Sequence, residues 1–63
     1  MRLEYRGFVG VVVADDQTLH GRVQGIRDIV TFEGRSEAEA VQAFRDSVDD
    51  YLEFCASENI EPG

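Results

Sequence analysis

The segment from Ser36 to Glu58 constrains the fold of this 63-residue chain most, because its pattern is that of one long amphipathic helix. Its apolar residues recur every three or four positions, which places them on one face of a helix. These residues are Ala40, Val41, Phe44, Val48, Tyr51, Leu52 and Cys55. Ser36 followed by Glu39 is a capping box, which satisfies backbone N–H groups at the start of a helix. We predict a helix over 36–58, roughly 34 Å long.

The residues before this helix favour strands joined by turns. Three segments are rich in β-branched and aromatic residues, and they are separated by Gly or by the polar turn Asp15–Thr18. We predict strands at 3–14, 19–24 and 28–32. Within the first, Gly7 and Gly10 indicate a bulge or a close approach of the backbone to another element. This order predicts a single α+β domain over 1–63, with an antiparallel three-stranded sheet covered by one helix.

The first predicted strand is apolar on both sides. Val9, Val11 and Val13 share one side, and Phe8 and Val12 share the other. A sheet with one face in water would not require two apolar sides, and a single helix covers only one of them. A chain of this length buries only about 60% of its unfolded surface, and its single Cys allows no intrachain disulfide. We therefore expect the protein to form a homo-oligomer.

The charge of the chain is concentrated on the predicted helix. The whole chain carries a net charge of −7. Segment 36–58 holds seven acids and one arginine, a net charge of −6, and the remainder holds six acids and five arginines, a net charge of −1. Nucleic-acid binding requires a net basic face, so this balance argues against it. A basic protein partner is the natural complement.

The expected location is the cytoplasm. The longest apolar run, Val11 to Ala14, is far shorter than the ~20 residues that cross a bilayer, so we expect no membrane span. A single unpaired thiol suits a reducing compartment better than secretion.

Four carboxylates of the helix and a neighbouring aromatic residue form the candidate partner-binding site. They are Asp46, Asp49, Asp50, Glu53 and Phe54. The acids lie at i, i+3, i+4 and i+7, on an arc separate from the apolar stripe. A row of carboxylates can imitate a phosphate backbone and bind Arg or Lys of a basic protein. A solvated face that only confers solubility and a site for a hard metal cation are the alternatives. Phe54 is either a packing flank or an interface anchor.

The sequence predicts no catalytic residue, metal ligand or cofactor. His20 is the only histidine, and its strand parity groups it with Arg22 and Gln24. That grouping favours an exposed surface histidine over an acid–base catalyst. Cys55 lies on the apolar stripe among acidic neighbours, which favours a buried hydrophobic side chain over a reactive thiol. We therefore do not expect an enzyme.

Two segments resemble the HicB-like antitoxin family. Gly21–Gly34 reads GRVQGIRDIVTFEG, which has the pattern G-x-V-x-G-I-x-D-I-V-T-F-E-G of one branch of that family. Ala43–Cys55 reads AFRDSVDDYLEFC, which has the pattern A-F-x-x-S-V-D-D-Y-L-x-F-C of the same branch. The N-terminal Tyr5-Arg6-Gly7 is similar as well, so the resemblance extends from Tyr5 to Pro62.

This resemblance implies a partial ribonuclease H-like fold that lacks nuclease activity. Family members are antitoxins of type II toxin–antitoxin pairs. Their N-terminal domain binds and blocks HicA, a small basic messenger-RNA interferase with a fold like that of double-stranded-RNA-binding domains. An acidic inhibitor of a basic toxin agrees with the charge distribution of this chain.

The sequence departs from the family after the helix. Many members continue into a ribbon-helix-helix or helix-turn-helix DNA-binding segment, and none follows Glu61-Pro62-Gly63. We therefore do not expect DNA binding from these residues. Two other functions remain open: an orphan homo-oligomeric interaction domain with no toxin partner, and a residual metal-dependent nuclease suggested by the fold resemblance and the surplus of acids.

Overall fold

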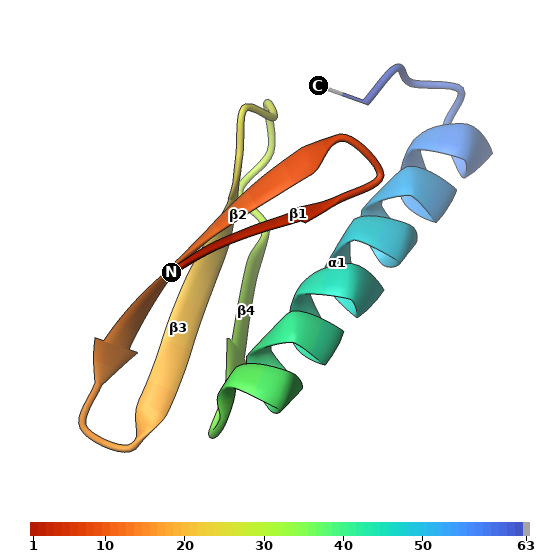
Figure 1. The fold of residues 1–63 in the computed structure, drawn as a ribbon. Coiled ribbons are helices and arrows are strands. Elements are labelled where there is room, and N and C mark those ends of the chain that lie inside the picture. Colours follow the sequence, from red (N-terminus) through yellow and green to blue (C-terminus); the bar gives the residue numbers. More distant parts are fainter. Residues whose placement is uncertain (63) are drawn as a thin grey trace.

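The computed structural model describes residues 1–62, which form two layers: an antiparallel four-stranded sheet and one helix across it (Figure 1). The elements in chain order are β1 (Arg2–Tyr5), β2 (Phe8–Asp15), β3 (Thr18–Gln24), β4 (Thr31–Gly34) and α1 (Glu37–Ser57). The strands lie side by side in the order β1-β2-β3-β4, so each pairs with its neighbour in sequence. The predicted α+β class is confirmed. The predicted number of strands is wrong, because there are four and not three among the described residues.

The strand predicted at 3–14 is in fact a hairpin made of β1 and β2. Tyr5 pairs with Phe8, and the two residues between them turn the chain. Both have positive φ, 52° at Arg6 and 86° at Gly7. Two consecutive left-handed residues form the type I′ turn that joins tightly paired strands. The bulge expected at Gly7 is therefore a turn. The sequence pattern did not predict it, because strand-forming residues lie on both sides.

The third predicted strand, 28–32, begins and ends too early. The strand β4 covers Thr31–Gly34, and the residues from Gly25 to Val30 form a loop in which Gly25 has a φ of 73°. The loop is tied to β3 where the N–H of Val23 donates to the carbonyl of Val30 at 3.0 Å. Gly34, the last residue of β4, packs closely against α1, since a Cβ there would lie 2.5 Å from the backbone nitrogen of Ala40. The strand thus ends at a position where a glycine leaves room for the helix backbone.

The predicted helix is confirmed over almost its whole length. Ser36 is the N-cap, and its Oγ accepts a hydrogen bond from the N–H of Glu39 at 3.1 Å. The Glu39 carboxylate in turn accepts from the N–H of Arg35 at 3.0 Å. At the other end, Asn59 has a φ of 56° and the N–H of Ile60 donates to the carbonyl of Cys55 at 2.8 Å. These are the bonds of a Schellman motif, which stops the helix without a glycine.

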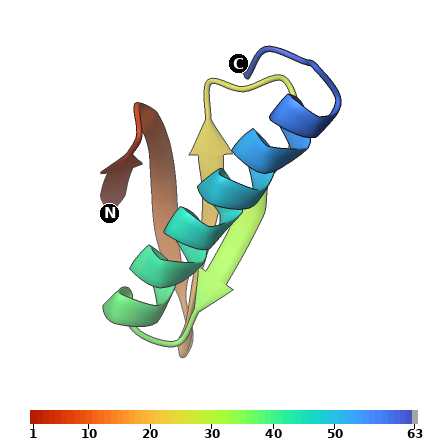
Figure 2. The same cartoon turned by 90° about the vertical axis from the view of Figure 1, so that its right-hand side faces the viewer.

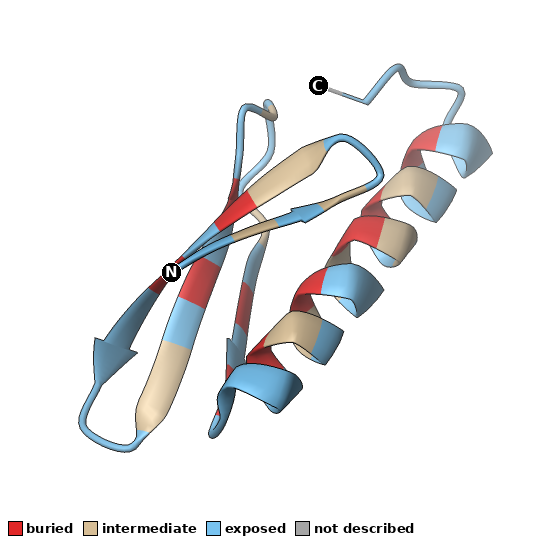
Figure 3. Ribbon diagram, viewed as in Figure 1, coloured by how far each residue is buried: buried red, intermediate tan, exposed pale blue. Residues whose placement is uncertain are grey.

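The core is a layer of side chains between α1 and the sheet. Every fully buried helix position lies on the predicted stripe and faces the sheet (Figure 3). The rings of Phe32 and Phe44 pack with their centroids 5.3 Å apart. They lie over two glycines: a Cβ at Gly10 would come within 2.7 Å of the Phe44 ring, and one at Gly21 would overlap the Phe32 ring. The close approach predicted at Gly10 is confirmed.

Within residues 1–62, the opposite face of the sheet is uncovered. Figure 2 shows that α1 lies across one face only. On the other face, the side chains of Val11 and Val13 are 41% and 64% exposed. The prediction that one helix leaves an apolar strand side uncovered is thus confirmed for these two residues. The single helix of residues 1–62 lacks the apolar length that a bilayer crossing requires.

Gly21→Ala should destabilise the protein, because the added methyl group would push the buried Phe32 ring out of its place. We expect a loss of about 1–3 kcal/mol in the free energy of unfolding, measured by urea denaturation. Gln24→Ala, on the exposed side of the same strand, should change it by less than about 0.5 kcal/mol. Adding Phe32→Leu to Gly21→Ala should recover part of the loss relative to the sum of the two single variants. Strict additivity would contradict the proposed overlap.

Candidate functional site

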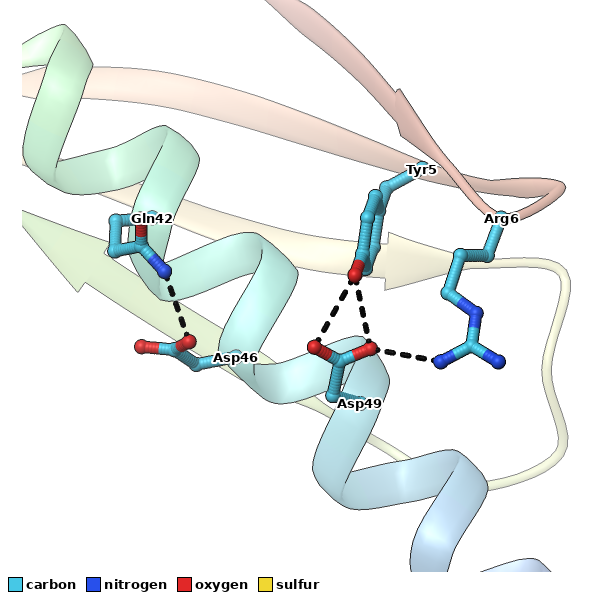
Figure 4. A network of polar contacts seen from close by, with 5 residues as sticks. All are labelled: Tyr5, Arg6, Gln42, Asp46 and Asp49. Atoms are coloured by element: carbon cyan, nitrogen blue, oxygen red, sulfur yellow. Dashed lines mark hydrogen bonds and ion pairs between the residues drawn. The ribbon is translucent and has the colours of Figure 1, made fainter.

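Three of the four helix carboxylates in the predicted partner-binding site are open to solvent. Asp46, Asp50 and Glu53 are all exposed. Asp46 accepts a hydrogen bond from Nε2 of Gln42 at 3.0 Å, one turn earlier on the helix (Figure 4). Within residues 1–62, Asp50 and Glu53 have no hydrogen-bond or ion-pair partner. These charges are therefore available to a cationic partner.

Asp49 differs from the other acids because it joins the helix to the β1–β2 turn. Its carboxylate accepts hydrogen bonds from the hydroxyl of Tyr5 at 3.1 and 3.2 Å (Figure 4). Nη1 of Arg6 donates to the same carboxylate at 2.9 Å. The guanidinium of Arg45 lies 5.6 Å from the centre of the Tyr5 ring, so the hydroxyl and the ring of Tyr5 both contact helix side chains. Asp49 is engaged within the chain, and its charge is already paired.

Phe54 lies beside an apolar hollow that the sequence alone did not predict. Its side chain is 52% exposed. The hollow, about 330 Å³, is lined by Val30, Ser47, Asp50, Tyr51 and Phe54. Ile29, next to Val30 in the loop, is 79% exposed. Exposed aromatic and aliphatic groups beside an unpaired carboxylate are suited to a partner that presents an apolar side chain next to a basic one.

Sequence reasoning missed Ile29 and Val30 because it placed both in a strand. The structure puts both in the loop before β4, where Val30 lines the hollow together with Phe54. A signal was present in the sequence: Gly25 and Asp28 are loop-forming residues that flank the apolar Ile26. The DIVTF string, rich in strand formers, outweighed it.

His20 and Cys55 lie on different elements and do not form a site together. His20 is on the uncovered face of the sheet, with Nδ1 3.5 Å from a carboxylate oxygen of Glu33 and Nε2 3.9 Å from one of Asp15. Cys55 is buried in the helix stripe, as predicted. The described part of the chain contains no cluster of three or more His, Cys, Asp or Glu side chains that could hold a metal ion. Asp46, Asp50 and Glu53 are exposed along the helix, whereas Asp49 binds the β1–β2 turn, so these carboxylates do not converge on one point.

Comparisons of the chain with protein-family models, with curated proteins and with solved structures gave no match. The functional argument therefore depends on the side chains themselves and on the sequence patterns they belong to.

Asp49→Ala and Asp50→Ala should differ in their effect on stability, because only Asp49 is paired within residues 1–62. Asp49→Ala removes the acceptor for Tyr5 and Arg6 and should lower the free energy of unfolding by about 1 kcal/mol, because half-exposed hydrogen bonds and ion pairs contribute modestly. Asp50→Ala, which breaks no contact of residues 1–62, should change it by less than about 0.5 kcal/mol. Urea denaturation followed by circular dichroism measures both. Equal losses in the two variants would contradict the assigned role of Asp49.

Proposed function

We propose that this protein is an inhibitory binding module of the antitoxin type, which neutralises a small basic messenger-RNA interferase similar to HicA. The observation that carries the proposal is the row of exposed carboxylates on α1, Asp46, Asp50 and Glu53, which lies inside the segment that resembles the HicB-like family. The resemblance supplies the class of partner, and the charge of the helix supplies the means of binding it. The proposed place of action is the cytoplasm, where both RNA and a free thiol persist.

Inhibition would operate by competition for the basic surface of the toxin. An RNA-cleaving toxin must hold phosphates with Arg or Lys side chains. Asp46, Asp50 and Glu53 present carboxylates along one helix face, and carboxylates form the same charge-assisted hydrogen bonds as phosphates. The hollow beside Phe54 would add apolar contact at the end of this row. A toxin bound in this way would have its RNA-binding surface covered.

The proposal includes a partial ribonuclease H-like fold. The succession of β2, β3, β4 and α1 supports it, with β1 added at the edge of the sheet. In this reading the sheet and helix serve as a scaffold for binding and not for cleavage. The outward, dispersed placement of the helix carboxylates supports a role without nuclease chemistry, because a two-metal site requires ligands that converge.

An orphan homo-oligomeric interaction domain is the second candidate function. The exposure of Val11 and Val13 on the uncovered face favours it. The two functions are distinguished at the gene level: a reading frame for a small basic protein next to the gene of this chain supports the antitoxin role, and its absence supports the orphan role.

The inhibitory role is tested by mixing the protein with a HicA-type toxin and a labelled RNA. We expect RNA cleavage to stop once the protein is in excess, because the toxin surface that binds RNA would be occupied. Gel electrophoresis of the RNA measures the result. Continued cleavage at a large excess of the protein would remove the antitoxin proposal.

The binding face is tested by reversing charges on α1 while Asp49 is kept intact. Asp46→Lys, Asp50→Lys and Glu53→Lys together should weaken toxin binding by roughly 100-fold, measured by calorimetry. The matched control reverses Asp15, Asp28 and Glu61, three exposed acids outside α1. Each triple variant has a net charge of −1, because three reversals add six charges to −7. Equal weakening by both sets would mean that net charge, and not this face, determines binding.

A further inference from the structure

We propose that the uncovered face of the sheet is the interface between two copies of this chain. This inference goes beyond the antitoxin role and does not depend on it, because it concerns the protein alone. It assigns a surface and an occupant to the expected homo-oligomer. We call this surface the open face. It is made by the side chains of the four strands that lie on the side of the sheet away from α1.

The open face has an apolar centre. Val9, Val11 and Val13 follow one another along β2, which is an inner strand of the sheet. Val13 is 64% exposed, more than any other valine of the four strands. Beside this row lies a hollow of about 300 Å³, lined by Val11, Val13, His20, Gly21, Arg22 and Gln24. A projecting apolar row next to a hollow allows the face to fit against a second copy of itself, as a two-fold interface requires.

Charge indicates which partner suits this face. The open face carries Arg2, Glu4, Asp15, Arg22 and Glu33, a net charge of −1, although the whole chain carries −7. A strongly basic partner gains little from a face that is almost neutral. A second copy meets nearly balanced charges there, in which each arginine can approach an acid of the other copy.

The acidic helix supports the same arrangement. Association through α1 would bring two rows of carboxylates together, which costs free energy because like charges repel at short range. Because α1 covers the other face of the sheet, pairing through the open face leaves both helices on the outside (Figure 2). The dimer would thus present two acidic faces that point in opposite directions.

The size of the face predicts a moderate affinity. The molecule measures 39 × 17 Å in its two longest dimensions, so a flat face offers on the order of 600 Å² per copy, which is the lower end of specific interfaces. Two sheets that pack face to face with interdigitated valines bury such an area as in a β-sandwich. We therefore expect a reversible dimer and not an obligate one.

Sedimentation equilibrium of the protein alone tests the proposal. The wild-type chain should form a dimer of 7.1 kDa subunits. Val13→Glu should weaken the dimer by roughly 30-fold or more, because it buries an unpaired charge at the centre of the interface. Ile60→Glu is the matched control, since it places the same charge on an exposed aliphatic residue that follows α1, outside the four strands. It should leave the dimer within about twofold of wild type.

Circular dichroism checks the fold of each variant, and Val13→Thr, which keeps the shape of valine, provides a milder second variant.

Salt provides an independent measurement. Raising the ionic strength from about 0.05 to 0.5 M should strengthen the dimer, because it screens the repulsion between two chains of net charge −7. An interface held by helix ion pairs would weaken instead. A monomer at about 0.5 mM, a dimer that resists Val13→Glu and Val13→Thr, or one abolished by Ile60→Glu would each overturn the proposal. So would a monomer whose toxin binding is lost in Val13→Glu, because the toxin would then cover this face. Loss of toxin inhibition with an intact dimer would instead reject the antitoxin role alone.

Discussion

The packing of two aromatic rings against two glycines determines how the helix meets the sheet. Phe32 comes from β4 and Phe44 from α1, and their rings fill the space that Gly10 and Gly21 leave above β2 and β3. Without side chains at these glycines, the rings lie directly on the backbone of the inner strands. A small domain has few other ways to bury two large aromatic side chains completely. The spacing and direction of α1 follow from this contact.

The direction of α1 in turn sorts its charged residues into two groups. Asp49 is turned toward the β1–β2 hairpin, where Tyr5 and Arg6 bind it. Asp50, the next residue, is rotated by about 100° and points away from that hairpin. One acid therefore stabilises the fold, whereas its neighbour is available for binding. The same geometry places Phe54 next to the loop before β4 and creates the apolar hollow there.

Elements with strong local signals were predicted well. The helix was predicted to within one residue at each end, because a capping box and a long apolar period act within a few residues of each other. β3 was predicted to within one residue for a similar reason, since the Asp15–Thr18 turn and Gly25 bound it. The hairpin at Arg6-Gly7 was not predicted, because no residue preference indicates a positive φ at an arginine. Only the pairing of Tyr5 with Phe8 reveals it.

The order of residues is enough to predict the helix, its stripe, the concentration of charge on it and the presence of an apolar strand side that one helix cannot cover. These depend on residue order alone, through the periods of helix and strand. Only the folded structure shows which acids are paired, that Val30 lies in a loop and lines a hollow with Phe54, and that Val11 and Val13 face solvent. These depend on contacts between residues distant in sequence, and such contacts follow from how the phenylalanine rings seat α1 on the sheet.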